Sequence, residues 1–364
     1  MNKKEIIIII SGFLLLLFGV GFFFFLYEAK STVLNTVATG LLPKLEPIDM
    51  TIAPVSRQVA TPEPKPVEQV NLLFTGDIML DRSVLLKTQA SGDYSYPFKN
   101  LDYFNNYDFK IGNLEGPITD FKSVANGTGG NRLTFTFSPQ FLEPLKNYFD
   151  VVSLANNHTN NFGKKGLTQT YANLEKVGIK YFGDPDNKNN LSVVIEKNNI
   201  KIGLVGFHEL IGYGFNNVIA EIKKLRPEVN YIIVMPHWGT EYITDKPNRV
   251  QVSEAHKIID AGADLIIGTH PHVIQPIEKY NSKIIFYSLG NFIFDQYFSP
   301  ETQQGLNIGV NLKREYNNIN SELTILPITV SSESQPSLAE GEVKQQILDA
   351  LFKVSNVSST VFGL

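Results

Sequence analysis

Six apolar runs of this sequence are followed by side chains that can bind a metal ion or move a proton. The run LLFTG leads to Asp77, and the run VVSLA leads to an Asn-Asn-His triplet. In open α/β sheets the loops beyond the carboxyl ends of the strands form the ligand crevice, so these side chains are predicted to converge. In chain order the set is Asp77, Asn113, Glu115, Asn156, Asn157, His158, His237, His270, His272 and Asn291.

The chemistry of this set indicates divalent metal ions. It combines oxygen donors with imidazoles and has no sulfur, which suits Mn, Fe or Zn better than Ca or Mg. The donors outnumber the ligands of one tetrahedral site, so we predict two ions bridged by a carboxylate. Two such ions can activate a water molecule and hold an oxygen-rich substrate group. His158 is next to Asn157 and is not needed for coordination, so we assign it as the proton donor to a leaving group.

Each of these side chains also has a structural interpretation when it is taken singly. Asp77 could cap the helix that is expected from about Met79, and Glu115 could lie in a solvated turn. Asn156 and Asn157 are residues that favour turns for local hydrogen-bonding reasons. The functional interpretation depends on their joint occurrence at six strand ends, because six independent coincidences would otherwise be needed.

The elements that position these residues belong to one expected α/β domain, residues 70–364. Short β-branched runs alternate with helix-length amphipathic stretches, which indicates a sheet covered by helices on both faces. The runs LNIGVNLK and SELTILPITV, separated by a polar turn, predict an antiparallel pair. Residues 336–355 predict a closing helix, with Glu340 and Glu342 in its first turn.

The N-terminal residues predict a membrane anchor. Residues 6–27 contain no charged side chain, and a helix of this length spans about 30 Å, the hydrocarbon thickness of a bilayer. A cleaved signal peptide is the alternative, but no convincing small-x-small cleavage site follows. Lys3 and Lys4 place residues 1–5 in the cytoplasm by the positive-inside rule. Residues 28–69 read as a proline-rich linker, and the domain is expected outside the cell membrane.

Charge and cysteine content exclude several classes of function. The formal net charge is −4, and no long basic run follows the first residues, so we expect no nucleic-acid partner. The chain has no cysteine, which excludes disulfides, thiolate metal sites and cysteine nucleophiles.

Six motifs in this order resemble those of the CapA-type poly-γ-glutamate capsule biosynthesis family. They are GDIMLDR, GNLEGPIT, SLANNHTNNFG, MPHWGTEY, ADLIIGTHPHVIQPIE and YSLGNFIFDQ, and the resemblance covers roughly residues 70–355. The family is similar to a branch of the calcineurin-like metallophosphoesterases. This resemblance implies a four-layer α/β sandwich of two mixed sheets flanked by helices, a two-metal centre and a membrane-anchored domain outside the cell.

Carried over residue by residue, the resemblance implies a role for each matching position. Asp77 would ligate the first ion, and Glu115 would bridge the pair. Asn157, His237 and His270 would bind the second ion, and His272 would be a further ligand of the first ion. His158 would be the acid beside the substrate.

The wider superfamily usually has Asp in the place of Glu115, and a second departure changes the ligand set. That superfamily normally has a histidine two residues after the aspartate of the first motif, and this sequence has Met79 there. The first ion therefore loses a donor, which water or Asn113 would have to replace. The resemblance leaves open whether both metal sites fill.

Further residues are predicted to contact the substrate or to support the ligands. Arg82 could steer an anionic substrate, although a surface ion pair explains it equally well. The supporting residues are Asn113, Asn156, Asn291 and Asp295.

Three functions fit these observations. The first is a metal-dependent hydrolase or transferase of capsule polymer synthesis, export or attachment, for which the resemblance implies a poly-γ-glutamate context. The second is a non-catalytic subunit that binds the anionic polymer and the membrane subunits of a capsule synthase complex. The third is a phosphoesterase that acts on cell-envelope substrates.

Overall fold

The computed structural model describes residues 68–125, 133–316 and 318–363, all of which belong to one compact unit. The predicted cytoplasmic tip (1–5), membrane anchor (6–27) and almost all of the linker (28–69) lie outside the described residues. Among the helices that are described, none is both long and apolar enough to cross a membrane.

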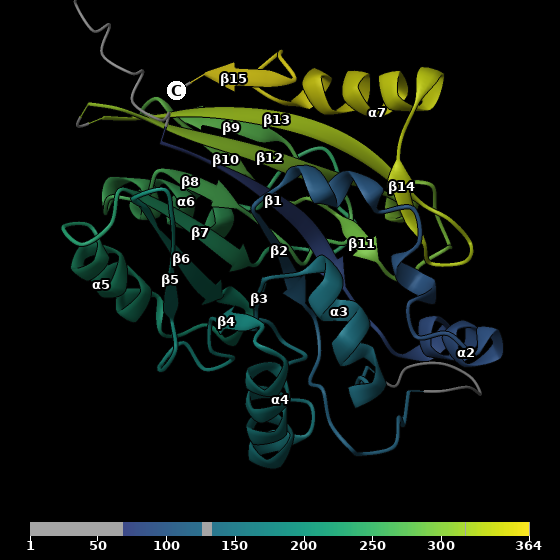
Figure 1. The fold of residues 1–364 in the computed structure, drawn as a ribbon. Coiled ribbons are helices and arrows are strands. Elements are labelled where there is room, and N and C mark those ends of the chain that lie inside the picture. The colour runs from purple at the N-terminus through teal and green to yellow at the C-terminus, as the bar shows by residue number, and fades with distance from the viewer. Residues whose placement is uncertain (1–67, 126–132, 317, 364) are drawn as a thin grey trace, which may run out of the picture. The chain divides into compact units, whose positions relative to one another are not determined.

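Two mixed β-sheets stack on each other within these residues (Figure 1). The strands of the first sheet are β1 (Gln69–Ile78), β2 (Phe109–Leu114), β3 (Val151–Ser153), β4 (Lys180–Phe182), β11 (Asn291–Ile293), β12 (Gln304–Glu315), β13 (Asn318–Val330), β14 (Pro336–Leu338) and β15 (Val361–Gly363). Strands β1 to β4 and β11 are parallel, and β12 to β15 join the sheet through antiparallel pairs. The predicted antiparallel pair is confirmed as β12 and β13.

The second sheet has a parallel centre with one antiparallel strand at each edge. Strands β6, β7, β8 and β10 are parallel, and β5 and β9 pair with them in the opposite direction. Its strands are β5 (Ser192–Lys197), β6 (Ile200–His208), β7 (Tyr231–His237), β8 (Leu265–Ile267), β9 (Ile277–Tyr280) and β10 (Lys283–Phe286).

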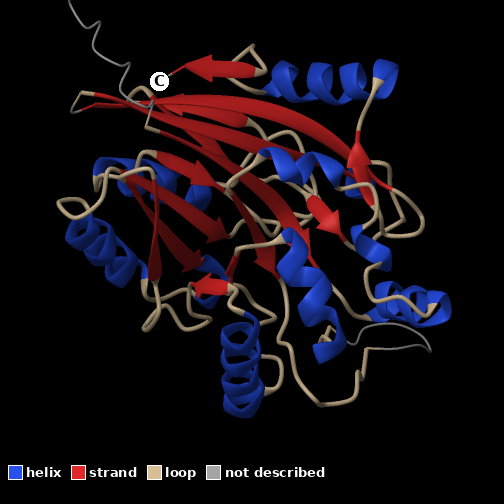
Figure 2. Cartoon of the chain, in the orientation of Figure 1, coloured by secondary structure: helices blue, strands red, loops and turns tan. Residues whose placement is uncertain are grey.

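Helices cover the outer face of each sheet, as Figure 2 shows in blue. The first sheet is covered by α2 (Arg82–Ser91), α3 (Leu142–Tyr148) and α4 (Gly163–Val177), and the second by α5 (Phe215–Leu225) and α6 (Arg249–Asp260). Short 3₁₀ turns lie at Tyr96–Phe98, Asp102–Asn106, Pro139–Phe141, Glu209–Ile211 and Glu301–Gln303. The prediction of two mixed sheets flanked by helices is therefore confirmed for the described residues.

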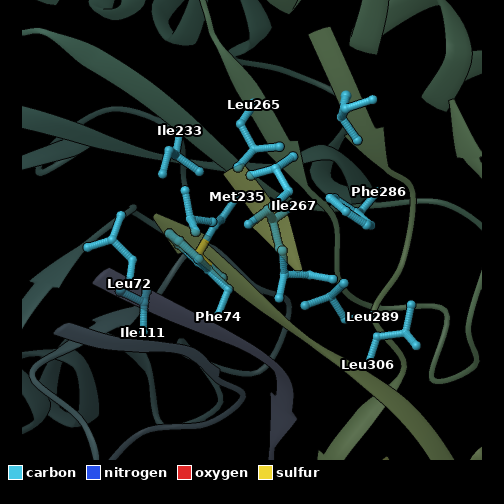
Figure 3. Close-up of a cluster of buried hydrophobic side chains, with 14 of the residues drawn as sticks. Leu72, Phe74, Ile111, Ile233, Met235, Leu265, Ile267, Phe286, Leu289 and Leu306 are labelled. Carbon is cyan, nitrogen blue, oxygen red and sulfur yellow. The ribbon is translucent and has the colours of Figure 1, made fainter. Parts of the chain in front are cut away.

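The core between the sheets follows from the two-residue period of a strand. On β1, Leu72 and Phe74 face the second sheet, whereas Leu73 faces the outer helices. On β7, Met235 faces the first sheet, and Val234 packs under α5 and α6. Figure 3 shows side chains of both sheets meeting in this layer. Strands buried on both faces explain why the runs in the sequence are almost continuously apolar.

The closing helix is shorter than the sequence predicted and has a different role from the outer helices. Residues Pro336–Leu338 form β14, because they pair with the end of β13 after a tight turn. The helix α7 (Gly341–Val354) begins only after them, with Glu342 in its first turn and Glu340 just before it. Leu348 and Leu351 of α7 join the core between the sheets. The helix therefore closes one side of the sandwich next to β13 (Figure 1).

Gly76 brings β1 against the segment that leads into β11. A Cβ atom at this position would lie 1.9 Å from the carbonyl oxygen of Gly290, and the next residue, Asp77, donates its N–H to the same oxygen at 3.2 Å. The backbone can pass here only without a side chain, and this contact sets the position of Asp77.

We expect Gly76→Ala to lower the free energy of unfolding by about 3 kcal/mol or more, because the added carbon overlaps a backbone atom that cannot rotate away. Urea unfolding measures the loss. Gly92→Ala is the matched control, because a Cβ at Gly92 would have open space around it. Its only cost is the left-handed backbone conformation, with a φ of 70°, which lowers the free energy of unfolding by about 1 kcal/mol. Equal losses in the two variants would contradict the proposed close approach.

Candidate metal centre

Strand ends from both sheets meet at one place and bring five of the predicted ligands together. Asp77 lies at the end of β1, Glu115 directly follows β2, and His237 ends β7. One ligand atom from each of these three residues lies within 4.8 Å of the other two. The loop after β8 adds His270 and His272, and the imidazole rings of His237 and His270 are 4.7 Å apart.

Asp77 is held by a chain of amides and is not a helix cap. Asn156 donates from Nδ2 to Asn113 Oδ1 at 3.0 Å, and Asn113 donates from Nδ2 to Asp77 Oδ1 at 2.8 Å. The second oxygen of Asp77 accepts the backbone N–H of His270 at 3.2 Å. The cap of α2 is Asp81, which accepts from its first N–H. The structural interpretation of Asp77 is therefore wrong, and Asn113 and Asn156 serve to fix its carboxylate.

Glu115 gives the clearest indication that the cluster fits a cation. Its side chain is fully buried, and within the part of the chain that the structure describes neither carboxylate oxygen has a hydrogen-bond partner. Burial raises the pKa of the Glu115 carboxyl well above its usual range, and the nearby Asp77 carboxylate raises it further. Two buried carboxylates without a counter-charge are costly, so the donor set fits a divalent cation.

The imidazoles are in the form that binds metals. Burial, with a smaller contribution from the neighbouring imidazoles, lowers the pKa of His237 well below its usual range and that of His270 to about 3. A neutral imidazole ring has one nitrogen lone pair, which is the donor that binds a metal ion. Asn157 Oδ1 lies 2.9 Å from His237 Nε2, so this predicted amide ligand is next to the imidazole ring of His237.

Asn291 fixes the orientation of His272. Its Nδ2 donates to Gln296 Oε1 at 3.1 Å and to the Thr302 carbonyl at 3.0 Å, so its Oδ1 is the acceptor for His272 Nδ1 at 3.0 Å. The proton of His272 therefore sits on Nδ1. Its Nε2 lone pair is left free, 3.7 Å from Glu115 Oε1. Hydrogen bonds of this kind orient metal-binding histidines.

His158 lies beside the carboxylates but is fixed differently. Asn161 Oδ1 already accepts the Phe135 N–H at 2.7 Å, so it also accepts from His158 Nδ1 at 3.1 Å. The free Nε2 then faces Glu115 Oε1 at 3.8 Å. Burial lowers the pKa of His158 to about 4. At neutral pH the ring is thus a proton acceptor, which can donate a proton only after it has taken one.

Comparison with known proteins identifies the family. A model described as "Bacterial capsule synthesis protein PGA_cap" matches residues 71–296, which include every predicted site residue from Asp77 to Asp295. This chain belongs to the PGA_cap family. It is 32% identical over 306 residues to the PGA biosynthesis protein CapA of Bacillus subtilis (strain 168), with 78% of each chain covered. It is 27% identical over 308 residues to the capsule biosynthesis protein CapA of Bacillus anthracis, covering 79% of this chain and 74% of that one.

Among solved structures, the calcineurin-like phosphoesterase YfkN from Bacillus subtilis is similar with a TM-score of 0.38. The two chains are 16% identical, and the likeness covers 79% of this chain and 98% of that one.

Arg82 of this PGA_cap protein forms an ion pair beside the carboxylates. Its guanidinium contacts the Asp295 carboxylate and lies 5.0 Å from the ring centre of Phe135 and 5.4 Å from that of Phe294. Asp295 also accepts the Ser83 N–H at 3.0 Å. Arg82 is only about one-fifth exposed, with 22% of its side chain accessible. The alternative of a simple surface pair therefore fits less well than a positioned cation at the rim.

Met79 of this PGA_cap chain agrees with the lost donor that the sequence indicated, whereas Glu241 adds a donor that was not predicted. Met79 is fully buried, and its sulfur accepts the Asp81 N–H at 3.1 Å, so it supplies no donor to the site. Glu241, which we did not predict, forms a second group with His270 and His272, whose ligand atoms lie within 4.8 Å of one another. The one available signal was its place in the motif MPHWGTEY, four residues after His237.

Proposed function

We propose that this protein is a membrane-anchored, extracytoplasmic hydrolase or transferase of poly-γ-glutamate capsule synthesis that depends on divalent metal ions. The observation that carries the proposal is the meeting of Asp77, Glu115 and His237 in a buried cluster where the Glu115 oxygens have no other partner among the described residues. Membership of the PGA_cap family supports the capsule context.

Asp77, Glu115, His237, His270 and His272 would hold the ions, which fit Mn, Fe or Zn because the donors are oxygen and imidazole nitrogen. A divalent cation bound here supplies Lewis acidity, since it lowers the pKa of water and withdraws electrons from a carbonyl or phosphoryl oxygen.

His158 is proposed to move the proton. Its neutral Nε2 takes a proton from the attacking water, and the imidazolium then gives it to the leaving nitrogen of an amide as the C–N bond breaks. Asn161 holds the ring through Nδ1 at 3.1 Å during both steps. Arg82 is proposed to bind a carboxylate of the anionic polymer at the rim, because 22% of its side chain is accessible to solvent.

The location and partners of the protein are part of the proposal. The uncharged residues 6–27 support a single membrane span, and Lys3 and Lys4 support a cytoplasmic N-terminus. The partners would then be the growing capsule polymer and the membrane subunits of the synthase or export machinery. The relative in Bacillus subtilis carries the name PGA biosynthesis protein CapA, which agrees with such partners.

A second candidate function is a non-catalytic, polymer-binding subunit of a capsule synthase complex. It is favoured by Met79, whose sulfur is turned toward Asp81 and leaves the site one expected donor short.

The test is turnover by the full-length protein. The substrates tested are poly-γ-glutamate, γ-glutamyl peptides and simple phosphodiesters. Each is assayed with the protein in Mn²⁺, with the protein stripped by a chelator, and with the stripped protein after Mn²⁺ is added back. We expect cleavage or transfer of γ-glutamyl bonds that chelation abolishes and Mn²⁺ restores. Turnover of phosphodiesters alone would favour the alternative of a phosphoesterase that acts on cell-envelope substrates. Polymer binding without any turnover would favour the second candidate, a non-catalytic binding subunit.

A further inference from the structure

Glu241 adds a carboxylate to the two histidines that follow β8. One ligand atom from each of Glu241, His270 and His272 lies within 4.8 Å of the other two. The histidines are buried, at 5% and 3% exposure, whereas Glu241 is exposed. This group shares no residue with the buried group of Asp77, Glu115 and His237. The ligands therefore form two adjoining groups, an inner one closed to solvent and an outer one open on one side, and His272 lies at their boundary with its Nε2 3.7 Å from Glu115 Oε1.

The backbone around Glu241 is tied to the histidine segment. Tyr242 donates its N–H to the carbonyl of Pro271, the residue between the two histidines, at 2.9 Å. Its hydroxyl accepts from Gln296 Nε2 at 3.1 Å, and its φ of +64° lies in the left-handed region that few side chains adopt. A residue held in this way is positioned by the fold. The Glu241 carboxylate is thus presented to the histidines by a fixed loop.

The histidine segment itself is strained and has an unused donor atom. His270 and His272 both have positive φ, at 97° and 58°. The N–H of His270 bonds to Asp77 at 3.2 Å, which couples the outer group to the inner one. His270 Nδ1 is buried and, among the residues described, has no hydrogen-bond partner. Backbone strain together with an unpartnered imidazole nitrogen is expected where a ligand completes the site.

We propose that Glu241 is the carboxylate ligand of an outer divalent-cation site that His270 and His272 complete, while Asp77, Glu115 and His237 form the inner site. This assignment rests on the proposed metal-dependent function. It separates His237 from His270, which the family resemblance had placed on the same ion. Glu241 supplies an anionic oxygen from the solvent side, so the outer cation is the one that faces the substrate.

Metal stoichiometry tests the assignment without any assay of activity. The full-length protein is stripped with chelator, titrated with Mn²⁺ by calorimetry, dialysed and analysed for metal content. We expect two Mn²⁺ per wild-type chain. Glu241→Gln should keep the inner ion and bind the outer one at least about tenfold more weakly, since even residues that only support a ligand change affinity by about 10–100-fold.

Asp245→Asn is the matched control, because it removes one negative charge from the same exposed loop outside both groups. We expect it to bind two Mn²⁺ with wild-type affinity. Two ions of unchanged affinity in Glu241→Gln would overturn the role of Glu241 and leave the proposed function standing. A wild-type protein that binds no Mn²⁺, Fe²⁺ or Zn²⁺ would overturn both.

Discussion

Replacing Glu115 with glutamine is expected to stabilise the metal-free protein at pH 8 and to remove its stabilisation by Mn²⁺. The Glu115 carboxylate is fully buried beside Asp77, and no described residue donates a hydrogen bond to it. Its ionisation is opposed first by burial and then by the like charge of Asp77, and both raise its pKa. Glutamine removes the charge at almost the same volume, so we expect a gain of about 1–3 kcal/mol in the free energy of unfolding.

The pH dependence of this gain tests its cause. The folded-state pKa of Glu115 lies above the value of about 4.3 for an unfolded glutamate. The folded metal-free protein therefore holds more protons than the unfolded chain, and this group's contribution to stability falls as the pH rises above about 4.3. The advantage of Glu115→Gln should be small at pH 5 and larger at pH 8. Urea unfolding in chelator measures it, and a variant less stable than wild type at pH 8 would contradict the argument.

Mn²⁺ is expected to offset the stability advantage of Glu115→Gln over the wild type. At a Mn²⁺ concentration of about 100 times Kd, the wild type gains about 2.7 kcal/mol from binding. Glu115→Gln should gain far less, because the amide presents only one weak oxygen donor. Glu315→Gln, which removes an exposed charge at the end of β12, is the control and should behave as wild type with and without Mn²⁺. An equal Mn²⁺ response in Glu115→Gln would remove Glu115 from the site.

The convergence of the site could be predicted because it depends on strand direction. Asp77 and Asn113 face each other across β1 and β2, and His208 and His237 do so across β6 and β7, since the strands of each pair are parallel and start at the same end of the sheet. Apolar runs identify such strands, so any polar residue just beyond them is placed with useful accuracy. The packing of the two sheets on each other brings their two rows of strand ends together. This packing is known only from the structure.

Other features depend on contacts that carry no periodic signal. Glu241 lies in an exposed loop, and its approach to His270 and His272 comes from a bond between Tyr242 and Pro271 across 29 positions of the chain. Asp77 and Asp81 are equally good helix caps by residue type, and only the structure shows that β1 continues through Asp77 to Ile78, so that Asp81 caps α2. The position of the proton on His272 follows from the partners of Asn291, which strand patterns do not reveal.

The two groups of ligands also give a reason for the family's combination of buried and exposed motif residues. The inner carboxylates are costly to bury without a cation, so binding and local stability are coupled. In the proposed outer site, the exposed Glu241 would let the cation exchange with solvent at a smaller cost. Under the proposed function, a long anionic polymer would reach the outer group and Arg82 without entering the core.

His158→Gln is expected to lower kcat by about 10²–10⁴-fold while the fold and the metal content stay as in the wild type. His158 belongs to neither ligand group, yet its Nε2 lies 3.8 Å from Glu115 Oε1 and its Nδ1 is held by Asn161. Glutamine can keep a hydrogen bond to Asn161 but cannot carry a proton between water and a leaving nitrogen. The comparison uses whichever substrate the wild type turns over.

Three measurements on the same variants separate catalysis from polymer binding. Asp77→Asn should lose metal and turnover together, and His256→Gln, whose ring stacks on Tyr280 at 3.8 Å, should keep both. Polymer binding by His158→Gln should remain near the wild-type level, because this residue acts on the proton and contributes no charge at neutral pH. An unchanged kcat in His158→Gln would remove the histidine from the mechanism. A parallel loss of polymer affinity and kcat would instead make it a residue of the polymer-binding surface, since a group that only transfers protons changes the rate of the bound complex and leaves the affinity alone.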